Sequence, residues 1–269
     1  MKGLLKISEF AALSGISRQL LIFYDNHGIL HPAVTDPENG YRYYSYRQID
    51  TANVIVAFRG AGMSLERIRE YLTARSPQNL MQILEMQEQE LERQIQKLEK
   101  IKAMVSVRMA QTERGISTRA GSVAIKEYPQ ENLFLGPELP KDYQLADGWN
   151  YLPQFYAACA EENIQLGFPV GTLVTQEKLE ERAWNQPAHY YYRLPKGQYP
   201  DFFQRPGGLY VEGTQLTDYG HTDTLYQQIL SYIEEHGLQI CGNAYEEFLI
   251  DEISESNPDA YLLQISVQV

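Results

Sequence analysis

The chain of 269 residues is long enough for two domains, and its 43% hydrophobic and 22% charged residues exclude a wholly disordered protein. Its longest apolar stretch, residues 52–58, is far shorter than the roughly 20 residues of a membrane-spanning helix. The two cysteines, Cys159 and Cys241, provide neither a disulfide framework nor a cysteine metal site. The amino terminus reaches charged residues too early for a signal peptide. We therefore expect a cytoplasmic protein that does not enter a membrane.

Charge is distributed unevenly along the chain, whose formal total is −12. Residues 1–114 hold 15 Lys and Arg against 13 Asp and Glu, whereas residues 115–269 hold 8 against 22. A locally basic segment can approach the phosphates of a nucleic acid, and a strongly acidic segment cannot. The two parts of the chain are therefore expected to bind different partners.

The first 30 residues predict two short helices joined by a tight turn. Apolar residues recur at helical spacing from Ile7 to Leu13, and Gly15 interrupts the pattern. Ser17 is a suitable N-cap for a second helix over residues 18–25. Two such helices form a helix-turn-helix, although many helical hairpins of this kind bind nothing.

A hairpin is predicted after these helices. The segment Asp36-Pro37-Glu38-Asn39-Gly40 is a strong turn signal, because proline presets φ and Asn-Gly tolerates a left-handed backbone. The following run, Tyr41-Arg42-Tyr43-Tyr44, favours a strand. A hairpin in this place is a wing, and its aromatic and basic residues suit contacts with sugar and phosphate. The alternative is that these tyrosines only pack the hairpin onto the helices.

Several motifs follow one another in residues 5–73. They are Ile7-Ser8-Glu9-Phe10-Ala11, Phe23-Tyr24-Asp25, Gly28-Ile29-Leu30-His31-Pro32, Asn39-Gly40-Tyr41-Arg42-Tyr43-Tyr44-Ser45 and Gly62-Met63-Ser64-Leu65-Glu66-Arg67-Ile68. In this order they resemble the DNA-binding domain of the MerR transcription regulators. The resemblance implies DNA contacts from the second helix and the wing, through Ser17, Arg18, Gln19, Tyr24, Tyr41, Arg42 and Tyr43.

One position departs from the family pattern. The second helix of MerR regulators usually contains Leu-Arg-Tyr-Tyr, and Ile22 stands in the place of that arginine. This leaves Arg18 and Gln19 as the better candidates for reading bases in the major groove.

Residues 77–114 predict one long helix, because Pro77 suits a helix start and no further Pro or Gly occurs before Gly115. Apolar side chains recur every seven residues, and at about 1.5 Å per residue the helix would span roughly 55 Å. A narrow apolar stripe on so long a helix favours a partner helix over a solvated linker. The resemblance implies antiparallel pairing in a homodimer. The expected dimerisation residues are Leu84, Leu91, Ile95, Leu98 and Val105.

Residues 119–269 predict an α+β domain with one antiparallel sheet, built from two β-α-β-β units in tandem. The expected strands are 122–128, 170–175, 189–194, 209–216, 244–250 and 261–269, with helices at 149–160 and 222–236. This order, together with Tyr245-Glu246-Glu247-Phe248-Leu249, resembles the gyrase-inhibitor-like effector-binding domain of MerR multidrug sensors of the BmrR type. The expected domains are a winged helix-turn-helix at 1–75, a coiled-coil dimerisation helix at 76–115 and an effector-binding domain at 119–269.

Arrangements that serve catalysis or metal binding do not occur in the sequence. The five histidines form no metal-ligand spacing, and the chain has neither a glycine-rich phosphate loop nor a Gly-x-Ser-x-Gly motif. We therefore expect no catalytic residue, no metal and no cofactor.

Tyrosine is abundant in the acidic part of the chain, where 14 of the 20 tyrosines lie. Aromatic faces beside a carboxylate suit a lipophilic cation, because the rings supply dispersion and cation–π attraction and the carboxylate balances the charge. Packing within the sheet is the simpler explanation for any single tyrosine. The expected ring contacts are Trp149, Tyr151, Tyr190, Tyr192 and Tyr210.

Glu246 is the expected carboxylate of this pocket. It lies between Tyr245 and Phe248 in a segment apolar enough to be buried, where a carboxylate without a partner is unfavourable. Strand alternation sends Glu246 and Glu247 to opposite faces of the sheet. The resemblance assigns the inward role to Glu246, and Glu247 remains an alternative.

These features indicate a ligand-responsive transcription regulator that binds a palindromic promoter as a homodimer. The resemblance implies that a bound lipophilic cation, such as a drug or dye, activates transcription by distorting the DNA spacer for RNA polymerase. Two alternatives stay open. The C-terminal domain could be a hydrolase of small electrophiles that uses an internal Glu, or the protein could be a repressor that needs no ligand.

Overall fold

The computed structural model describes residues 3–141, 143 and 148–269, without the side chain of Trp149. The chain forms two compact units, Met1–Lys97 and Leu98–Val269, and the boundary between them lies inside a long helix. Within the described residues, no helix combines the length and the apolar character needed to cross a membrane. The two units are described in turn.

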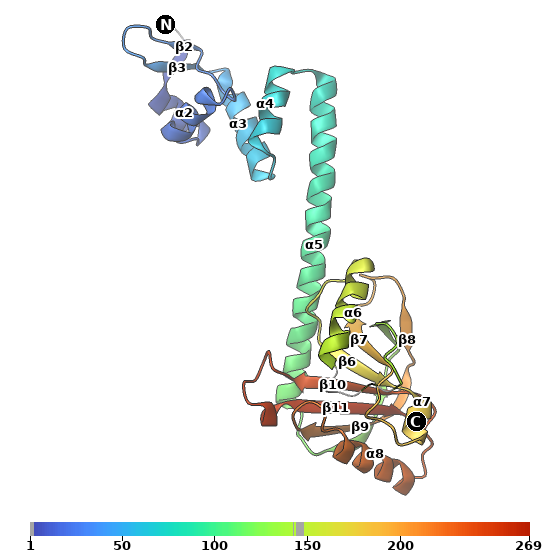
Figure 1. Cartoon of the computed structure of the whole chain (residues 1–269). Helices are drawn as coiled ribbons and strands as arrows, with labels where there is room; N and C mark the ends of the chain where they lie inside the picture. Colours follow the sequence, from blue (N-terminus) through green and yellow to red (C-terminus); the bar gives the residue numbers. More distant parts are fainter. Residues whose placement is uncertain (1–2, 142, 144–147) are drawn as a thin grey trace. The chain divides into compact units, whose positions relative to one another are not determined.

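Unit 1 (Met1–Lys97) is helical and carries a small antiparallel sheet (Figure 1). Its elements are β1 (Leu4–Lys6), α1 (Ile7–Ser14), α2 (Arg18–Asn26), β2 (Val34–Thr35), β3 (Arg42–Ser45), α3 (Gln48–Gly60), α4 (Leu65–Thr73) and the first part of α5 (Pro77–Ser117). Helices α1 and α2 meet at Gly15, whose φ of 69° is left-handed. Strands β2 and β3 form the wing, with β3 between β1 and β2. The winged helix-turn-helix predicted from the sequence is confirmed.

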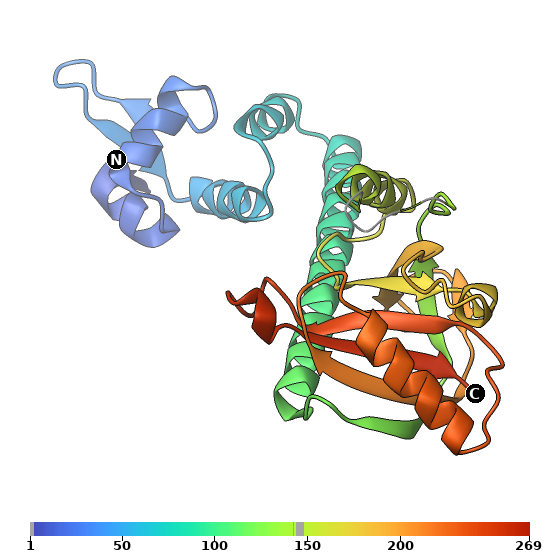
Figure 2. The ribbon, with the colours of Figure 1, turned by 60° about the horizontal axis from the view of Figure 1, so that its bottom comes forward.

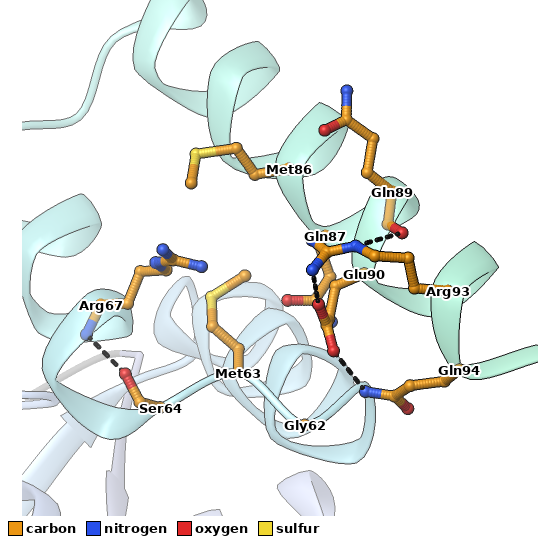
Figure 3. Close-up of a pocket in the computed structure, with 10 residues that line it drawn as sticks. All are labelled: Gly62, Met63, Ser64, Arg67, Met86, Gln87, Gln89, Glu90, Arg93 and Gln94. Carbon is orange, nitrogen blue, oxygen red and sulfur yellow. Dashed lines mark hydrogen bonds and ion pairs between the residues drawn. The ribbon is translucent and has the colours of Figure 1, made fainter. Parts of the chain in front are cut away.

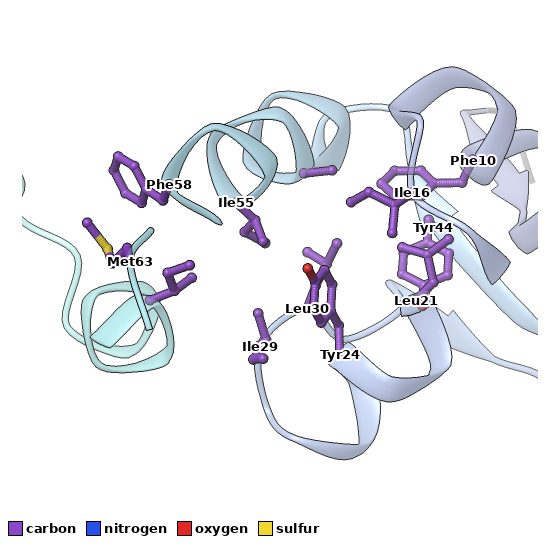
Figure 4. Close-up of a cluster of buried hydrophobic side chains, with 12 residues drawn as sticks. Phe10, Ile16, Leu21, Tyr24, Ile29, Leu30, Tyr44, Ile55, Phe58 and Met63 are labelled. Carbon is purple, nitrogen blue, oxygen red and sulfur yellow. The ribbon is translucent and has the colours of Figure 1, made fainter. Parts of the chain in front are cut away.

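The core of unit 1 fixes the wing to the helices. Side chains from every helix of the unit meet in one cluster, which includes Phe10, Leu21 and Ile55 (Figure 4). Tyr44 of β3 enters the same cluster, and its ring stacks on Phe10 with centroids 4.6 Å apart. Because Tyr44 is fully buried, β3 has a fixed position relative to α1 and α2.

Unit 2 (Leu98–Val269) is built on one antiparallel sheet (Figures 1 and 2). Besides the last part of α5 it contains β4 (Val123–Tyr128), β5 (Glu131–Leu135), α6 (Gly148–Glu161), β6 (Val170–Val174), α7 (Gln176–Glu180), β7 (His189–Leu194), β8 (Phe203–Arg205), β9 (Gly208–Leu216), α8 (Asp223–Glu235), β10 (Ala244–Ile250), η2 (Pro258–Ala260) and β11 (Leu262–Gln268). The predicted antiparallel α+β architecture is confirmed. Strands β5 and β8 and helix α7 were not predicted.

The sheet of unit 2 curls so that its edges approach each other. Its strand order is β4-β9-β11-β10-β6-β7-β5-β8, which places β4 and β8 at opposite edges. Yet only two residues separate β4 from β5, and only two separate β8 from β9. In agreement with this, the guanidinium carbon of Arg205 on β8 lies 4.6 Å from the ring centroid of Tyr128 on β4. The curl encloses one face of the sheet, which we call the inner face.

Helices α6 and α8 both cover the opposite face, which we call the helix face; Figure 2 shows α8 across it. Ala244 and Val174 belong to the cluster that packs against α8. Val170 lies on the same side of β6 as Val174 and packs against the cluster that contains Phe155 of α6. Strand alternation therefore places Glu246 on the helix face and Glu247 on the inner face.

Helix α5 continues beyond the point where the sequence pattern predicts its end. It includes Gly115 and ends at Ser117, whereas the pattern predicts an end at residue 114. A Cβ added to Gly115 would lie 2.6 Å from Ile250 Cδ1 and 3.0 Å from the backbone oxygen of Leu249. The missing side chain thus lets the helix approach β10 closely, and the packing offsets the low helix propensity of glycine.

The close approach of Gly115 to β10 predicts whether Gly115→Ala raises or lowers the stability of unit 2. In an exposed helix Gly→Ala stabilises by about 1 kcal/mol, but Gly115→Ala should destabilise unit 2 by about 1–3 kcal/mol through overpacking. Urea unfolding followed by tryptophan fluorescence measures this directly, because both tryptophans belong to unit 2. Gly60→Ala, in unit 1 and with open space around it, should leave that transition unchanged. A raised urea midpoint for Gly115→Ala would contradict the packing described here.

Candidate functional sites

The N-terminus of α2 presents three polar side chains to solvent. Ser17 is the N-cap, and its hydroxyl accepts a hydrogen bond from the Leu20 amide at 3.2 Å. Arg18 and Gln19 occupy the first two helical positions and are exposed. A helix N-terminus with a free guanidinium and a free amide can approach an anionic backbone and hydrogen-bond to base edges.

The wing presents a second set of side chains. Tyr41 is 56% exposed, and Arg42 and Tyr43 are partly exposed. Asp25 holds the guanidinium group of Arg42, because Arg42 Nε donates a hydrogen bond to Asp25 Oδ2 at 2.8 Å. Tyr24 differs from the other predicted DNA-binding residues: it is 3% exposed and belongs to the core of unit 1.

A groove of about 400 Å³ lies elsewhere in unit 1, between the turn that precedes α4 and the first half of α5 (Figure 3). Met63 and Met86 form its apolar part, and Arg93 pairs with Glu90 at 2.9 Å in its polar part. None of the residues predicted from the sequence to bind DNA, ligand or a second chain lines this groove.

The predicted dimerisation residues lie exposed along α5. Their exposed fractions are large for apolar side chains, between 37% for Leu91 and 64% for Leu98. Leu84, Leu91, Leu98 and Val105 are spaced by seven residues and Ile95 lies four residues after Leu91, so the five side chains share one side of α5 and form an exposed apolar stripe. Such a stripe is unfavourable in water and suits a partner helix.

On the helix face, Glu246 bonds to neutral groups. Its carboxylate accepts hydrogen bonds from the Thr172 hydroxyl and, at 2.7 Å, from the hydroxyl of Tyr226 on α8. The Tyr226 ring stacks against Trp184 with centroids 5.3 Å apart. Burial raises the pKa of Glu246, and the two hydroxyl donors offset part of that increase. Among the described residues, no Lys, Arg or His forms an ion pair with this carboxylate.

Three of the predicted aromatic residues belong to the same face of unit 2. Tyr190 and Tyr192 are buried beside α6, and Tyr151 packs against the same cluster. Thr172 pairs with Glu246 on one side and with Tyr190 on the other, so these three residues form a row across β10, β6 and β7. The Tyr190 hydroxyl lies 2.7 Å from the hydroxyl of Tyr143.

One of the other two predicted aromatic residues, Tyr210, does not join this group. Tyr210 lies on the inner face, on the opposite side of the sheet from Glu246. The prediction for Trp149 falls on a side chain outside the described residues.

On the inner face, Glu247 is fully neutralised. Its Oε1 accepts hydrogen bonds from Arg193 Nη2 at 2.8 Å and from the Tyr191 hydroxyl at 3.0 Å. Burial alone would raise the pKa of Glu247, but the attraction of Arg193 and Arg114 lowers it below its ordinary value. Glu131 pairs with both Arg193 and Arg205, which connects the charges into one network.

Arg205 occupies an aromatic cage on the inner face. It is 1% exposed, and its guanidinium carbon lies 4.3 to 4.7 Å from the ring centroids of Tyr128, Tyr210 and Tyr245. The chain itself therefore supplies the cation of this cage. Sequence reasoning missed Arg205 and Glu131. The short run Phe203–Arg205 has no alternating pattern, and the cage forms only when the sheet curls.

The two faces of the sheet thus differ in their chemistry. The inner face pairs its carboxylates with guanidinium groups among buried tyrosines, which suits a structural core. The helix face keeps a carboxylate with neutral partners near buried aromatic rings, which suits a cationic organic molecule. Within the described residues, no group of three or more His, Cys, Asp and Glu side chains could hold a metal ion.

Comparison with known proteins identifies the amino-terminal region. The model described as "MerR HTH family regulatory protein" matches residues 5–75, and the model described as "MerR, DNA binding" matches residues 49–106. Both matches lie in the part of the chain that carries the helix-turn-helix, the wing and the first three-quarters of α5.

Similar proteins extend this result. The Multidrug-efflux transporter 2 regulator of Bacillus subtilis is 27% identical over 265 residues, which cover 97% of this chain and 94% of the relative. The Transcriptional regulator BrlR of Pseudomonas aeruginosa is 30% identical over 120 residues, 44% of this chain and 42% of the relative. A cryo-electron-microscopy structure of an EcmrR–DNA complex in EcmrR-RPo is similar over 98% of this chain and 100% of that one, with a TM-score of 0.41 and 17% identity. Residues 5–106 therefore carry the helix-turn-helix and DNA-binding domains of the MerR family, and the chain is similar over nearly its whole length to a regulator of a multidrug-efflux transporter.

Proposed function

We propose that this protein is a cytoplasmic, homodimeric transcription regulator that senses lipophilic cations on the helix face of unit 2, with Glu246 as the anionic group. The observation that carries the proposal is the contrast between two neighbouring carboxylates. Glu247 pairs with Arg193, whereas within the described residues Glu246 bonds only to the hydroxyls of Thr172 and Tyr226.

The electrostatics of Glu246 favour a cationic ligand. Its raised pKa means that the surroundings destabilise the ionised form. A bound cation would stabilise the ionised carboxylate of Glu246 by electrostatic attraction. This attraction is stronger in a partly desolvated site than in water. Glu247 offers no such gain, because Arg193 already neutralises it.

Aromatic side chains supply the lipophilic part of the site. Tyr190 is the nearest predicted ring in the row that begins at Glu246, and Tyr192 and Tyr151 extend the aromatic surface beside α6. The name of the related B. subtilis protein, which regulates a multidrug-efflux transporter, agrees with this class of ligand.

The remaining parts of the proposal concern DNA. The apolar stripe on α5 would pair with its copy in a second chain, so that two units 1 bind the halves of a palindromic promoter. Arg18 and Gln19 would read bases, and Tyr41, Arg42 and Tyr43 would contact the sugar-phosphate backbone. Ligand binding would distort the promoter spacer and so activate RNA polymerase through the shape of the DNA.

Glu246→Gln should lower the affinity for methyltriphenylphosphonium by roughly 30- to 150-fold, the range for an interaction of about 2–3 kcal/mol with a charged group. The neutral analogue triphenylphosphine oxide, if it binds, should be unaffected. Calorimetric titration of the full-length protein measures both. Wild-type affinity for the cation should also fall at acidic pH, as Glu246 takes up a proton at its raised pKa.

The stability changes of the two glutamates should have opposite signs. The raised pKa of Glu246 means that ionisation opposes folding as the pH rises, so Glu246→Gln should raise the urea midpoint of unit 2 at neutral pH. The lowered pKa of Glu247 contributes stability that is lost as the pH falls, so Glu247→Gln should destabilise by about 3 kcal/mol. Cation binding that survives Glu246→Gln but not Glu247→Gln would refute the assignment.

The proposed DNA contacts predict two different binding defects. Arg18→Ala should reduce discrimination at one base position by about 1–3 kcal/mol. Arg42→Ala should weaken all sequences alike and lower the salt slope by about one. Fluorescence anisotropy with a duplex selected from a random-sequence library, and with an unrelated duplex as control, separates the two effects. Unchanged binding by both variants would rule out this surface.

A further inference from the structure

Asp25 lies at a position that is unfavourable for the helix that carries it. It belongs to the last turn of α2, where the partial negative charge of the helix end repels a carboxylate. It also adds a negative charge to the unit that binds the DNA phosphates. A role beyond helix stability is therefore needed to explain this carboxylate.

The contacts of Asp25 point across the domain to the wing. Its Oδ2 accepts a hydrogen bond from Arg42 Nε at 2.8 Å, and its Oδ1 bonds to His31 Nδ1 at 2.9 Å. The pKa of Asp25 is lowered: burial opposes ionisation, but the hydrogen bonds of Arg42 and His31 outweigh it. Asp25 is therefore ionised where it accepts the hydrogen bond from Arg42.

We propose that Asp25 is a positioning residue for DNA binding, which orients Arg42 of the wing toward a backbone phosphate. The inference rests on the proposed contact between Arg42 and DNA. A guanidinium group has five N–H donors in a rigid, planar fork, so one edge can bind a carboxylate while other donors bind a phosphate. Only Nε of Arg42 is used here. Its two terminal nitrogens make no hydrogen bond to the described part of the chain.

The surroundings make this support rigid. Tyr44, two residues beyond Arg42 on the same side of β3, is stacked on Phe10 in the core. The Ser45 amide donates to Gln48 Oε1 at 2.8 Å, and Gln48 Nε2 donates to the His31 backbone oxygen at 2.7 Å. The carboxyl-terminal half of β3 is thus fixed to the helical part of unit 1. An arginine fixed in this way loses less side-chain entropy when it binds a phosphate.

The proposal and simple electrostatics predict opposite results for Asp25→Asn. Removal of a negative charge near DNA should tighten binding if only net charge matters. If Asp25 orients Arg42, the same substitution should weaken binding by about tenfold, as expected when an interaction of about 1.4 kcal/mol is lost. Glu38→Gln is the matched control, because Glu38 lies exposed in the wing turn and forms no ion pair with the described residues. It should leave binding unchanged or tighten it.

A double-mutant cycle makes the test specific. Binding of the full-length protein to the selected duplex is measured by fluorescence anisotropy for Asp25→Asn, Arg42→Ala and the double variant. The double variant should bind no more weakly than Arg42→Ala alone, because Asp25 acts through Arg42. A double variant that shows the full product of both losses would overturn the proposal, and so would an Asp25→Asn variant that binds as tightly as wild type.

A second substitution covers the case in which Asp25→Asn fails to fold. Arg42→Lys keeps the charge, but a single ammonium group cannot reproduce the two-sided fork between carboxylate and phosphate. It should weaken binding about as much as Arg42→Ala, and wild-type affinity would overturn the proposal. If Arg42→Ala itself leaves affinity unchanged, the underlying DNA contact fails. If Arg42→Ala weakens binding but Asp25→Asn and Arg42→Lys leave the affinity unchanged, the contact between Arg42 and DNA stands and the positioning role of Asp25 fails.

Discussion

Because side chains alternate between the two faces of a strand, β10 places two adjacent carboxylates in different environments. Glu247 faces the inner side of the curled sheet, where Arg193 neutralises it. Glu246 faces the helices and, in the part of the chain that the structure describes, its side chain receives hydrogen bonds only from Thr172 and Tyr226. The first arrangement stabilises the ionised carboxylate and the second does not, as the opposite directions of the two pKa shifts indicate. One carboxylate therefore serves the fold, and the other is available for a ligand.

The inner face explains how the domain can keep such an unfavourable group. The curl of the sheet brings Arg205 from one edge strand into a cage of tyrosines that includes Tyr128 from the other edge strand. Glu131 connects Arg205 to Arg193, so the charges of this face satisfy one another inside the molecule. A stable inner face leaves the helix face free to carry a group that destabilises the free protein, as functional sites commonly do.

Local patterns in the sequence predicted the features that depend on neighbouring residues. The glycine turns, the heptad repeat of α5 and the alternating strands each produce such a pattern, and so does the wing motif around Arg42. The features that depend on distant pairing were not predictable in this way. Strand β8 has three residues and no pattern, so Arg205 could not be recognised as the cation of a cage. Likewise, Gly115 reads as a helix end until its contact with Ile250 is known.

We propose that a cationic ligand supplies the counter-charge that the ionised form of Glu246 lacks among the described residues. Carbon-13 NMR of protein labelled at the glutamate carboxyl carbons tests it directly, with Glu246→Gln to assign the resonance. We predict that the carboxyl of Glu246 titrates above the ordinary range in the free protein, and that its pKa falls when methyltriphenylphosphonium binds. The neutral triphenylphosphine oxide should cause no comparable fall. A Glu246 resonance whose titration is unchanged by the bound cation would show that Glu246 is not the counter-charge of the ligand.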